Sequence, residues 1–62
     1  MNNRIDLLRY GKSYVFNFTH KKNIHGIVCE VNVDKNYFVI YDLTTKGYES
    51  IPQRRFLTAH PL

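Results

Sequence analysis

Apolar and polar residues alternate along much of the chain, and the alternation begins at Lys12. Tyr14, Phe16 and Phe18 alternate with Ser13, Val15, Asn17 and Thr19, which predicts a strand with one buried face. The segment 19–23 that follows is polar and charged. It is therefore predicted to be the loop of a β-hairpin.

A second, longer strand is predicted over residues 24–33. Gly26 lies inside it, and a glycine within a strand marks a bulge, a sharp bend or the close approach of another backbone. Residues 34–36 are typical of a turn. Residues 37–43 are aromatic or aliphatic except for Asp42, which predicts a third strand buried on both faces.

Two shorter strands are predicted to complete the sheet. Residues 48–51 form the fourth, after a turn at 44–47 in which Gly47 takes a positive φ. Pro52 ends regular pairing there, and a single helical turn is expected after it. Residues 56–59 then add a short fifth strand.

The region before the first strand has the signals of a short helix over residues 3–10. Asn3 is a favourable N-cap, Asp6 stands three positions later as in a capping box, and Gly11 suits the position after the helix. The apolar residues expected to close one end of the fold are Ile5, Leu7 and Leu8.

These elements predict an all-β protein, namely a small five-stranded, strongly bent antiparallel barrel of the SH3-like (Sm-like) kind with a short N-terminal helix. The chain has 62 residues, which allows one domain over 1–62, with the helix at 3–10 and the barrel at 12–59. Closing a small sheet hides its edges, and a glycine bend lets a long strand pass round the corner.

The segment 24–31, Ile-His-Gly-Ile-Val-Cys-Glu-Val, resembles the first Sm motif, in which apolar residues flank a glycine in a bent strand. The chain therefore resembles the Sm-like and Hfq-type superfamily of small β-barrels. The Hfq-type Lys-His pair falls on Gln53-Arg54, whereas the Arg-Gly pair of the second Sm motif has no counterpart. This resemblance implies the barrel fold, whereas the departures concern the residues of ring assembly and of the family's uridine pocket.

The second half is also similar to the WYL domain, itself an Sm-like barrel. Residues 37–39, Tyr-Phe-Val, take the place of the Trp-Tyr-Leu signature, and Arg55-Phe56 that of its closing Arg-Ile pair. Such a stand-alone barrel further resembles the small accessory proteins that phages encode.

Charge and composition narrow the partners. Nine Lys and Arg against five Asp and Glu give a net charge of +4, which favours nucleic acid or acidic protein surfaces. Cys29 is the only cysteine, so no disulfide forms within the chain. No apolar run is long enough for a membrane span or a secretory signal, and we expect a cytoplasmic protein without membrane contact.

Two basic clusters are candidate phosphate contacts. Lys21 and Lys22 lie in the predicted hairpin loop, with His25 just beyond it. The alternative is a solvated hairpin tip whose lysines prevent aggregation at the sheet edge.

Arg54 and Arg55 follow Pro52 and form the second cluster, and arginine binds phosphate in bidentate fashion and stacks on bases. The alternative for this pair is a salt bridge to an acidic residue, either Asp42 or Glu49.

Tyrosines are the candidate stacking residues, because their hydroxyl ends tolerate water. The candidates for stacking on unpaired bases are Tyr37, Tyr41 and Tyr48, with Tyr37 and Tyr48 preferred. The alternative is that they fill the core, as is expected for the phenylalanines at positions 16, 18, 38 and 56.

Metal binding and catalysis are not expected. His25 and Cys29 share a strand face but are about 13 Å apart by strand spacing, and no second cysteine is present. Ser13 and Ser50 have no triad pattern around them, and the chain has no glycine-rich phosphate loop. We therefore expect a binding module without cofactor, not an enzyme.

Three hypotheses follow. The first is a small basic module that binds single-stranded RNA or DNA through phosphate contacts and aromatic stacking. The second is a protein-interaction module, a regulator or inhibitor of phage type, that docks on a larger protein through a barrel edge with Val15 and Leu57 as apolar anchors. The third, compatible with either, is a homo-oligomer that pairs edge strands between copies.

Overall fold

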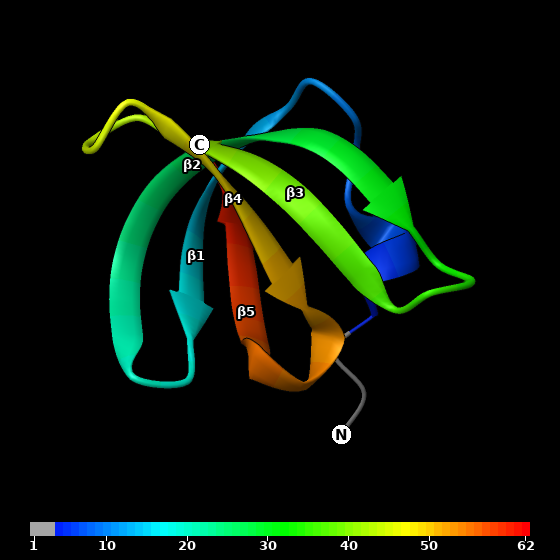
Figure 1. Cartoon of the computed structure of the whole chain (residues 1–62). Coiled ribbons are helices and arrows are strands. Elements are labelled where there is room, and N and C mark those ends of the chain that lie inside the picture. Colours follow the sequence, from blue (N-terminus) through cyan, green and yellow to red (C-terminus); the bar gives the residue numbers. More distant parts are fainter. Residues whose placement is uncertain (1–3) are drawn as a thin grey trace.

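The computed structural model describes residues 4–62, which form one five-stranded antiparallel sheet. Its order is β4-β3-β2-β1-β5, so the last strand pairs with the first, and β4 and β5 are the edges. The all-β class and the five antiparallel strands are thus confirmed, and the strands curve round a common core (Figure 1). The strands are β1 (Ser13–Phe18), β2 (Lys21–Asn32), β3 (Tyr37–Asp42), β4 (Gly47–Pro52) and β5 (Phe56–Pro61).

The predicted helix over residues 3–10 is wrong, because its described part is only the single 3₁₀ turn η1 (Ile5–Leu7). Leu8 is already extended, and the Arg9 N–H donates to the Tyr14 hydroxyl at 2.9 Å instead of to a helical carbonyl. So short a helix is marginal without such competition. Asn3, the predicted N-cap, lies outside the described residues.

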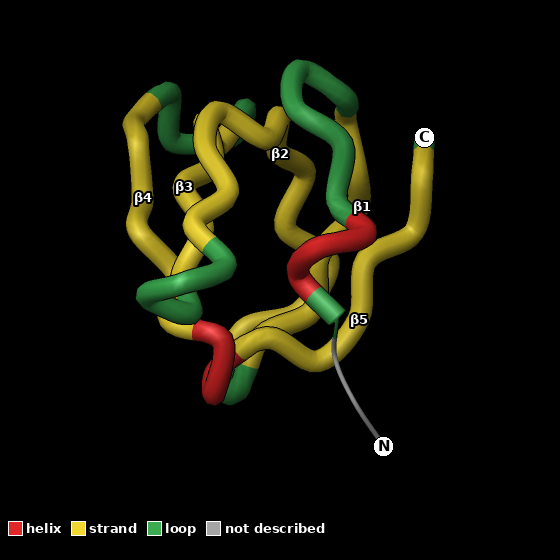
Figure 2. The backbone as a smooth tube through the Cα atoms, turned by 90° about the vertical axis from the view of Figure 1, so that its right-hand side faces the viewer, coloured by secondary structure: helices red, strands yellow, loops and turns green. Residues whose placement is uncertain are grey.

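A second 3₁₀ turn, η2 (Gln53–Arg55), joins β4 to β5, which confirms the helical turn expected after Pro52. The Gln53 N–H donates to the Asn36 carbonyl at 2.8 Å, and this bond ties η2 to the β2–β3 turn. In Figure 2, η1 lies beside β1 and β5, whereas η2 lies at the junction of β4 and β5.

The core is built from the inward side chains of alternating strand positions, as the period of two predicts. Phe16 is its centre, with ring centroids at 5.5 Å from Phe18, 5.6 Å from Phe38 and 6.4 Å from Phe56. Each buried phenylalanine contributes about 1.5–3 kcal/mol to folding. The four phenylalanines expected in the core are therefore confirmed there, and Ile5 of η1 covers the cluster.

β3 alternates between buried and half-buried residues, so the prediction that both of its faces are buried is wrong. The inward positions are Phe38, Ile40 and Asp42, of which Asp42 is only 6% exposed. Its Oδ1 accepts the backbone N–H of Thr44 at 2.8 Å and of Thr45 at 3.3 Å. The buried carboxylate is thus bonded and begins the β3–β4 turn.

Two turn predictions need correction. Segment 19–23 is not a loop, because β2 begins at Lys21 and Phe18 pairs with Lys21 across a two-residue turn. The positive φ of that turn is at His20 (73°). In the β3–β4 turn, Lys46 takes the positive φ (61°), not Gly47, because the chain turns one residue earlier than expected.

Candidate nucleic-acid interface

The β1–β2 hairpin tip and η2 meet at one end of the sheet. The Thr19 N–H donates to the Arg55 carbonyl at 2.8 Å, which joins two segments that are far apart in sequence. In Figure 1 both the hairpin tip and η2 lie at the lower end of the molecule. We call this region the basic end; its residues are His20, Lys21, Lys22, Arg54 and Arg55.

Three of the four predicted phosphate-contacting cations at the basic end have no carboxylate partner within residues 4–62. Lys22 and Arg54 are exposed and Arg55 is half-buried. Lys21 differs, because its Nζ lies 3.7 Å from Glu49 Oε2 and forms an exposed ion pair with β4. Lys22, Arg54 and Arg55 therefore remain available to an anion.

The salt bridges weighed for the two arginines are not formed. Glu49 is paired with Lys21, and Asp42 is buried against the backbone of its own turn. Neither carboxylate neutralises Arg54 or Arg55 in the described part of the chain. An anion at this end would meet uncompensated guanidinium groups, which hold phosphate in bidentate geometry.

Asn17 and Thr58 brace the hairpin beside the basic end, and the sequence-based reasoning passed over both as site residues. Asn17 Nδ2 donates to Thr58 Oγ1 at 2.8 Å, while Asn17 Oδ1 accepts the Asn23 N–H at 2.9 Å. Asn23 has a φ of 57° at the irregular start of β2. The Asn17 amide thus holds the hairpin to β5. Its position between the inward-facing Phe16 and Phe18 places it on the outer face of β1, which is the feature of the sequence that could have identified it.

Tyr37 and Tyr48 lie in different surroundings. Tyr37 is half-buried and its hydroxyl donates to Glu30 Oε2 at 3.0 Å, so a phosphate near this ring would meet a carboxylate. Tyr48 is 75% exposed and pairs across β3–β4 with Tyr41, with ring centroids 5.1 Å apart at 64°. This arrangement leaves much of the Tyr48 ring open to stacking.

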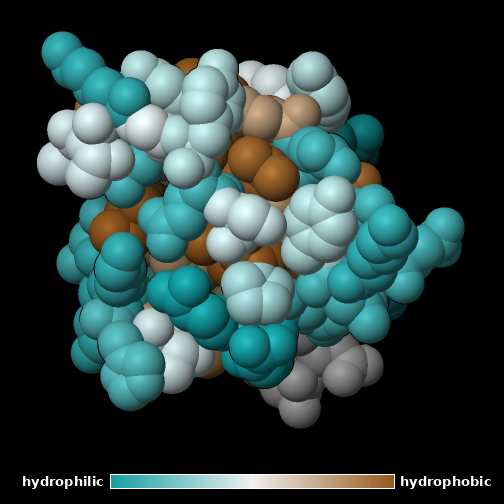
Figure 3. Space-filling model, in the orientation of Figure 1, coloured by the Kyte–Doolittle hydropathy of each residue, from teal (hydrophilic) through white to brown (hydrophobic). Residues whose placement is uncertain are grey.

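Tyr41 thus forms an aromatic pair with Tyr48, although Tyr37 and Tyr48 were the preferred candidates from sequence. The hairpin turn at 43–46 supplied the missing signal, because positions 41 and 48 stand symmetrically about it and therefore pair. On the face in Figure 3, hydrophilic side chains surround only small apolar patches.

His25 and Tyr48 are not part of the basic end. His25 is exposed, and its carbonyl accepts the Leu43 N–H at 2.9 Å, which places it beside the end of β3. Tyr48 is separated from Arg54 by about 15–20 Å along β4 and η2, from the strand rise. The predicted site therefore divides into a basic end and a separate group around the Tyr41–Tyr48 pair.

Within residues 4–62, no three His, Cys, Asp or Glu side chains are grouped so that they would hold a metal ion. Cys29 is half-buried, and its thiol faces the Ile27 carbonyl at 3.5 Å. No helix in this part of the chain has the length and apolar character needed to cross a bilayer.

No family model, no curated protein and no solved structure matches the sequence or the structure.

Proposed function

We propose that the protein is a non-enzymatic module that binds single-stranded RNA or DNA, with phosphate contacts from the basic end. The observation that carries the proposal is the Thr19–Arg55 hydrogen bond, which joins the hairpin that carries Lys22 to the turn that carries Arg54 and Arg55. These three cations have no carboxylate partner in residues 4–62. Neutralising phosphates with such cations releases counterions, which drives binding at low salt.

Tyr48 supplies the aromatic part of the proposal. Its ring is 75% exposed and is held by Tyr41 at 5.1 Å, so it is restrained before a base arrives. A strand that reaches both the basic end and Tyr48 runs about 15–20 Å along β4, a span of several nucleotides within the usual site size of about 4–16. Tyr37 and His25 are secondary, because Glu30 adjoins the first and the second lies off this path.

We further infer that the bent sheet is an open barrel of the SH3-like (Sm-like) kind. The order β4-β3-β2-β1-β5 supports this class, because β5 returns to pair with β1. The Lys21–Glu49 ion pair links the β1–β2 hairpin to the edge strand β4. The Thr19–Arg55 hydrogen bond continues the β1–β5 ladder into η2, the turn that connects β4 to β5. Such links bring the two edges of a curved sheet toward each other.

Fluorescence anisotropy with labelled oligo(U) and oligo(dT) at two salt concentrations tests the binding. We expect affinity that falls steeply with salt. The variant Lys22→Gln/Arg54→Gln should reduce the salt slope by about 1.4, because each phosphate contact on a single strand contributes about 0.7.

The matched control is Arg9→Gln/Lys12→Gln, which removes the same charge from exposed residues elsewhere on the molecule. The salt slope of this control variant should be nearly the same as that of the unmodified protein. If the salt slope falls equally in both variants, net charge and not the basic end explains the effect. Flat titrations at low salt would refute nucleic-acid binding altogether.

A further inference from the structure

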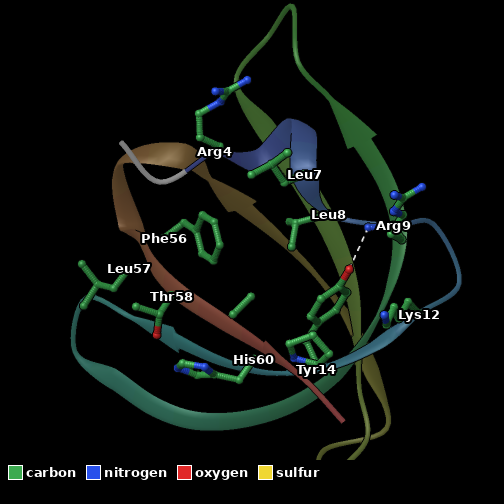
Figure 4. A pocket seen from close by; sticks show the side chains of 12 residues that line it. Arg4, Leu7, Leu8, Arg9, Lys12, Tyr14, Phe56, Leu57, Thr58 and His60 are labelled. Carbon is green, nitrogen blue, oxygen red and sulfur yellow. Dashed lines mark hydrogen bonds between the residues drawn. The ribbon is translucent and has the colours of Figure 1, made fainter. Parts of the chain in front are cut away.

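A groove lies between η1 and β5, on a part of the molecule that the proposed nucleic-acid site does not use. Its volume is about 460 Å³. Leu8, Tyr14 and Phe56 lie in the space between the 3₁₀ turn and the strand (Figure 4). The Tyr14 hydroxyl is already bonded to the Arg9 N–H, so these side chains present an apolar floor.

The groove follows the unpaired edge of β5. The Leu62 N–H donates to the Ser13 carbonyl at 3.2 Å, and β1 pairs with β5 in the register His60 opposite Val15. Backbone bonds alternate in an antiparallel ladder, so His60 turns its N–H and C=O toward β1 and Ala59 turns its own toward the groove. An incoming strand would therefore pair at Ala59.

Positive charge surrounds this groove. Its charged lining residues without a carboxylate partner are Arg9 and Lys12, both exposed; His60 lines it as well, and no Asp or Glu is among its lining residues. Arg4 also lines it, but its guanidinium is bound to Asp6 at 2.7 Å. An apolar floor, an open strand edge and a cationic rim thus occur together.

We propose that this groove binds an extended acidic peptide segment of a partner protein, which adds a strand to β5. Backbone pairing at Ala59 supplies the register, an apolar side chain contacts Leu8 and Leu57, and flanking carboxylates meet Arg9 and Lys12. Pro61 lacks an N–H, so pairing is weaker beyond Ala59.

A second copy of the chain fits this edge less well than an acidic peptide. Pairing β5 with β5 would bring two sets of Arg9 and Lys12 together, and like charges at an interface oppose association. A peptide rich in glutamate has the complementary charge. The proposal goes beyond nucleic-acid binding, because it uses none of the residues of the basic end.

The test is an NMR titration of the full, ¹⁵N-labelled chain with the capped heptapeptide Glu-Val-Glu-Leu-Glu-Val-Glu. We expect saturable shifts at the amides of Leu8 and Ala59. The same peptide N-methylated at its leucine should lose most of its affinity, because it loses a main-chain hydrogen bond. A peptide with lysine for glutamate should not bind.

The variant Arg9→Gln/Lys12→Gln should weaken binding of the acidic peptide about fivefold, as two rim contacts of modest strength imply. The matched variant Lys22→Gln/Arg54→Gln should leave peptide affinity within about twofold, although the same variant weakens oligonucleotide binding. Leu57→Ala tests the apolar anchor at a side chain that is 44% exposed, so the fold should tolerate it.

Four results would overturn the proposal: no saturable shift, shifts confined to the basic end, equal binding of the lysine peptide, or oligo(U) displacing the peptide from Ala59. Dimerisation through β5 without peptide would likewise replace the partner with a second copy. Because the two double variants separate the groove from the basic end, failure here leaves the nucleic-acid proposal intact.

Discussion

Gly26 lies in β2 at a position where β3 packs closely against it. A β-carbon at this position would lie 3.2 Å from Ile40 Cδ1 and 3.2 Å from the Tyr41 carbonyl oxygen. The close approach of backbone expected for a glycine inside this strand is thus confirmed. The register shift of β2 lies between Val28 and Glu30, so Gly26 is not itself the bulge.

Gly26→Ala should lower the free energy of unfolding by about 1–3 kcal/mol, the usual effect of overpacking. Gly47→Ala is the matched control, because its added carbon would meet nothing closer than Thr45 Oγ1 at 3.8 Å. The control should be neutral or up to about 1 kcal/mol more stable. Urea denaturation measures both, and equal stabilities would contradict the close packing at Gly26.

At Tyr48, Tyr48→Ala should weaken oligonucleotide binding by about 1–3 kcal/mol through the lost stacking, whereas Tyr48→Phe should retain most of the affinity. Tyr10→Ala removes a tyrosine of similar exposure, 79% against 75%, and should have no effect. Anisotropy titrations compare the three variants. If Tyr10 and Tyr48 behave alike, the base does not stack on Tyr48.

Among the elements, η1 differs most from its expected form. Asp6 was expected to cap a helix, but its carboxylate instead binds the Arg4 guanidinium through hydrogen bonds of 2.7 and 3.1 Å. Two N–H groups after Leu7 bond to strands in place of a helix: Arg9 donates to the Tyr14 hydroxyl of β1, and Gly11 donates to the Val28 carbonyl of β2 at 2.8 Å. Gly11 keeps the positive φ expected of it, at 81°.

The hydrogen bond from Arg4, followed by its charge, holds the pKa of the Asp6 carboxyl below its ordinary value. Because the pKa is lower in the folded state, the ion pair stabilises the turn at pH values above the ordinary pKa of aspartate. This stabilisation is lost as the pH falls through the lowered pKa. In Arg4→Gln, an NMR titration should show the Asp6 pKa return toward the ordinary value. An unchanged pKa would mean that the ion pair is absent in solution.

At the scale of the molecule, two regions of the described chain each gather cations without a carboxylate partner: the basic end, and the rim of the groove beside β5. Lys35 and Lys46 lie apart from both regions, in the β2–β3 and β3–β4 turns. The Lys21–Glu49 and Arg4–Asp6 pairs remove one cation from each. This separation allows each of the two double variants to test one region, because both variants lose the same positive charge.

A ligand that binds only the folded chain stabilises it by mass action. At an oligonucleotide concentration about 100-fold above Kd, the free energy of unfolding should rise by about 2.7 kcal/mol. For a domain of this size the corresponding rise in Tm is about 10–20 °C, measured by circular dichroism. The rise should be smaller in Lys22→Gln/Arg54→Gln, and an identical rise would contradict the assigned contacts.

Homo-oligomerisation stays a prediction, with the free edge of β4 as the strand available for pairing. Tyr48 and Ser50 are exposed on this edge strand, and Pro52 ends it. Sedimentation velocity at micromolar concentrations measures the assembly directly. A monomeric mass throughout would exclude the oligomer, whereas a ring or dimer should dissociate when an edge proline is introduced by Ser50→Pro.

The sequence by itself determined that there are five strands and which phenylalanines face inward. Side-chain parity is a local property of extended chain, so the positions of Phe16, Phe18 and Phe38 identify the core without knowledge of any partner strand. The short η2 followed from Pro52 in the same local way. The sequence did not determine the turn positions in the same way, because a shift of one residue moved the positive φ from the expected Gly47 to Lys46.

Only the tertiary structure decided which segments meet. The approach of Thr19 to Arg55, the pairing of β5 with β1, and the groove beneath η1 depend on how strongly the sheet curves. That curvature arises from long-range packing and from bulges in β1 and β2, which no local pattern specifies. The basic residues were therefore identifiable from sequence, whereas their division into two regions required the fold.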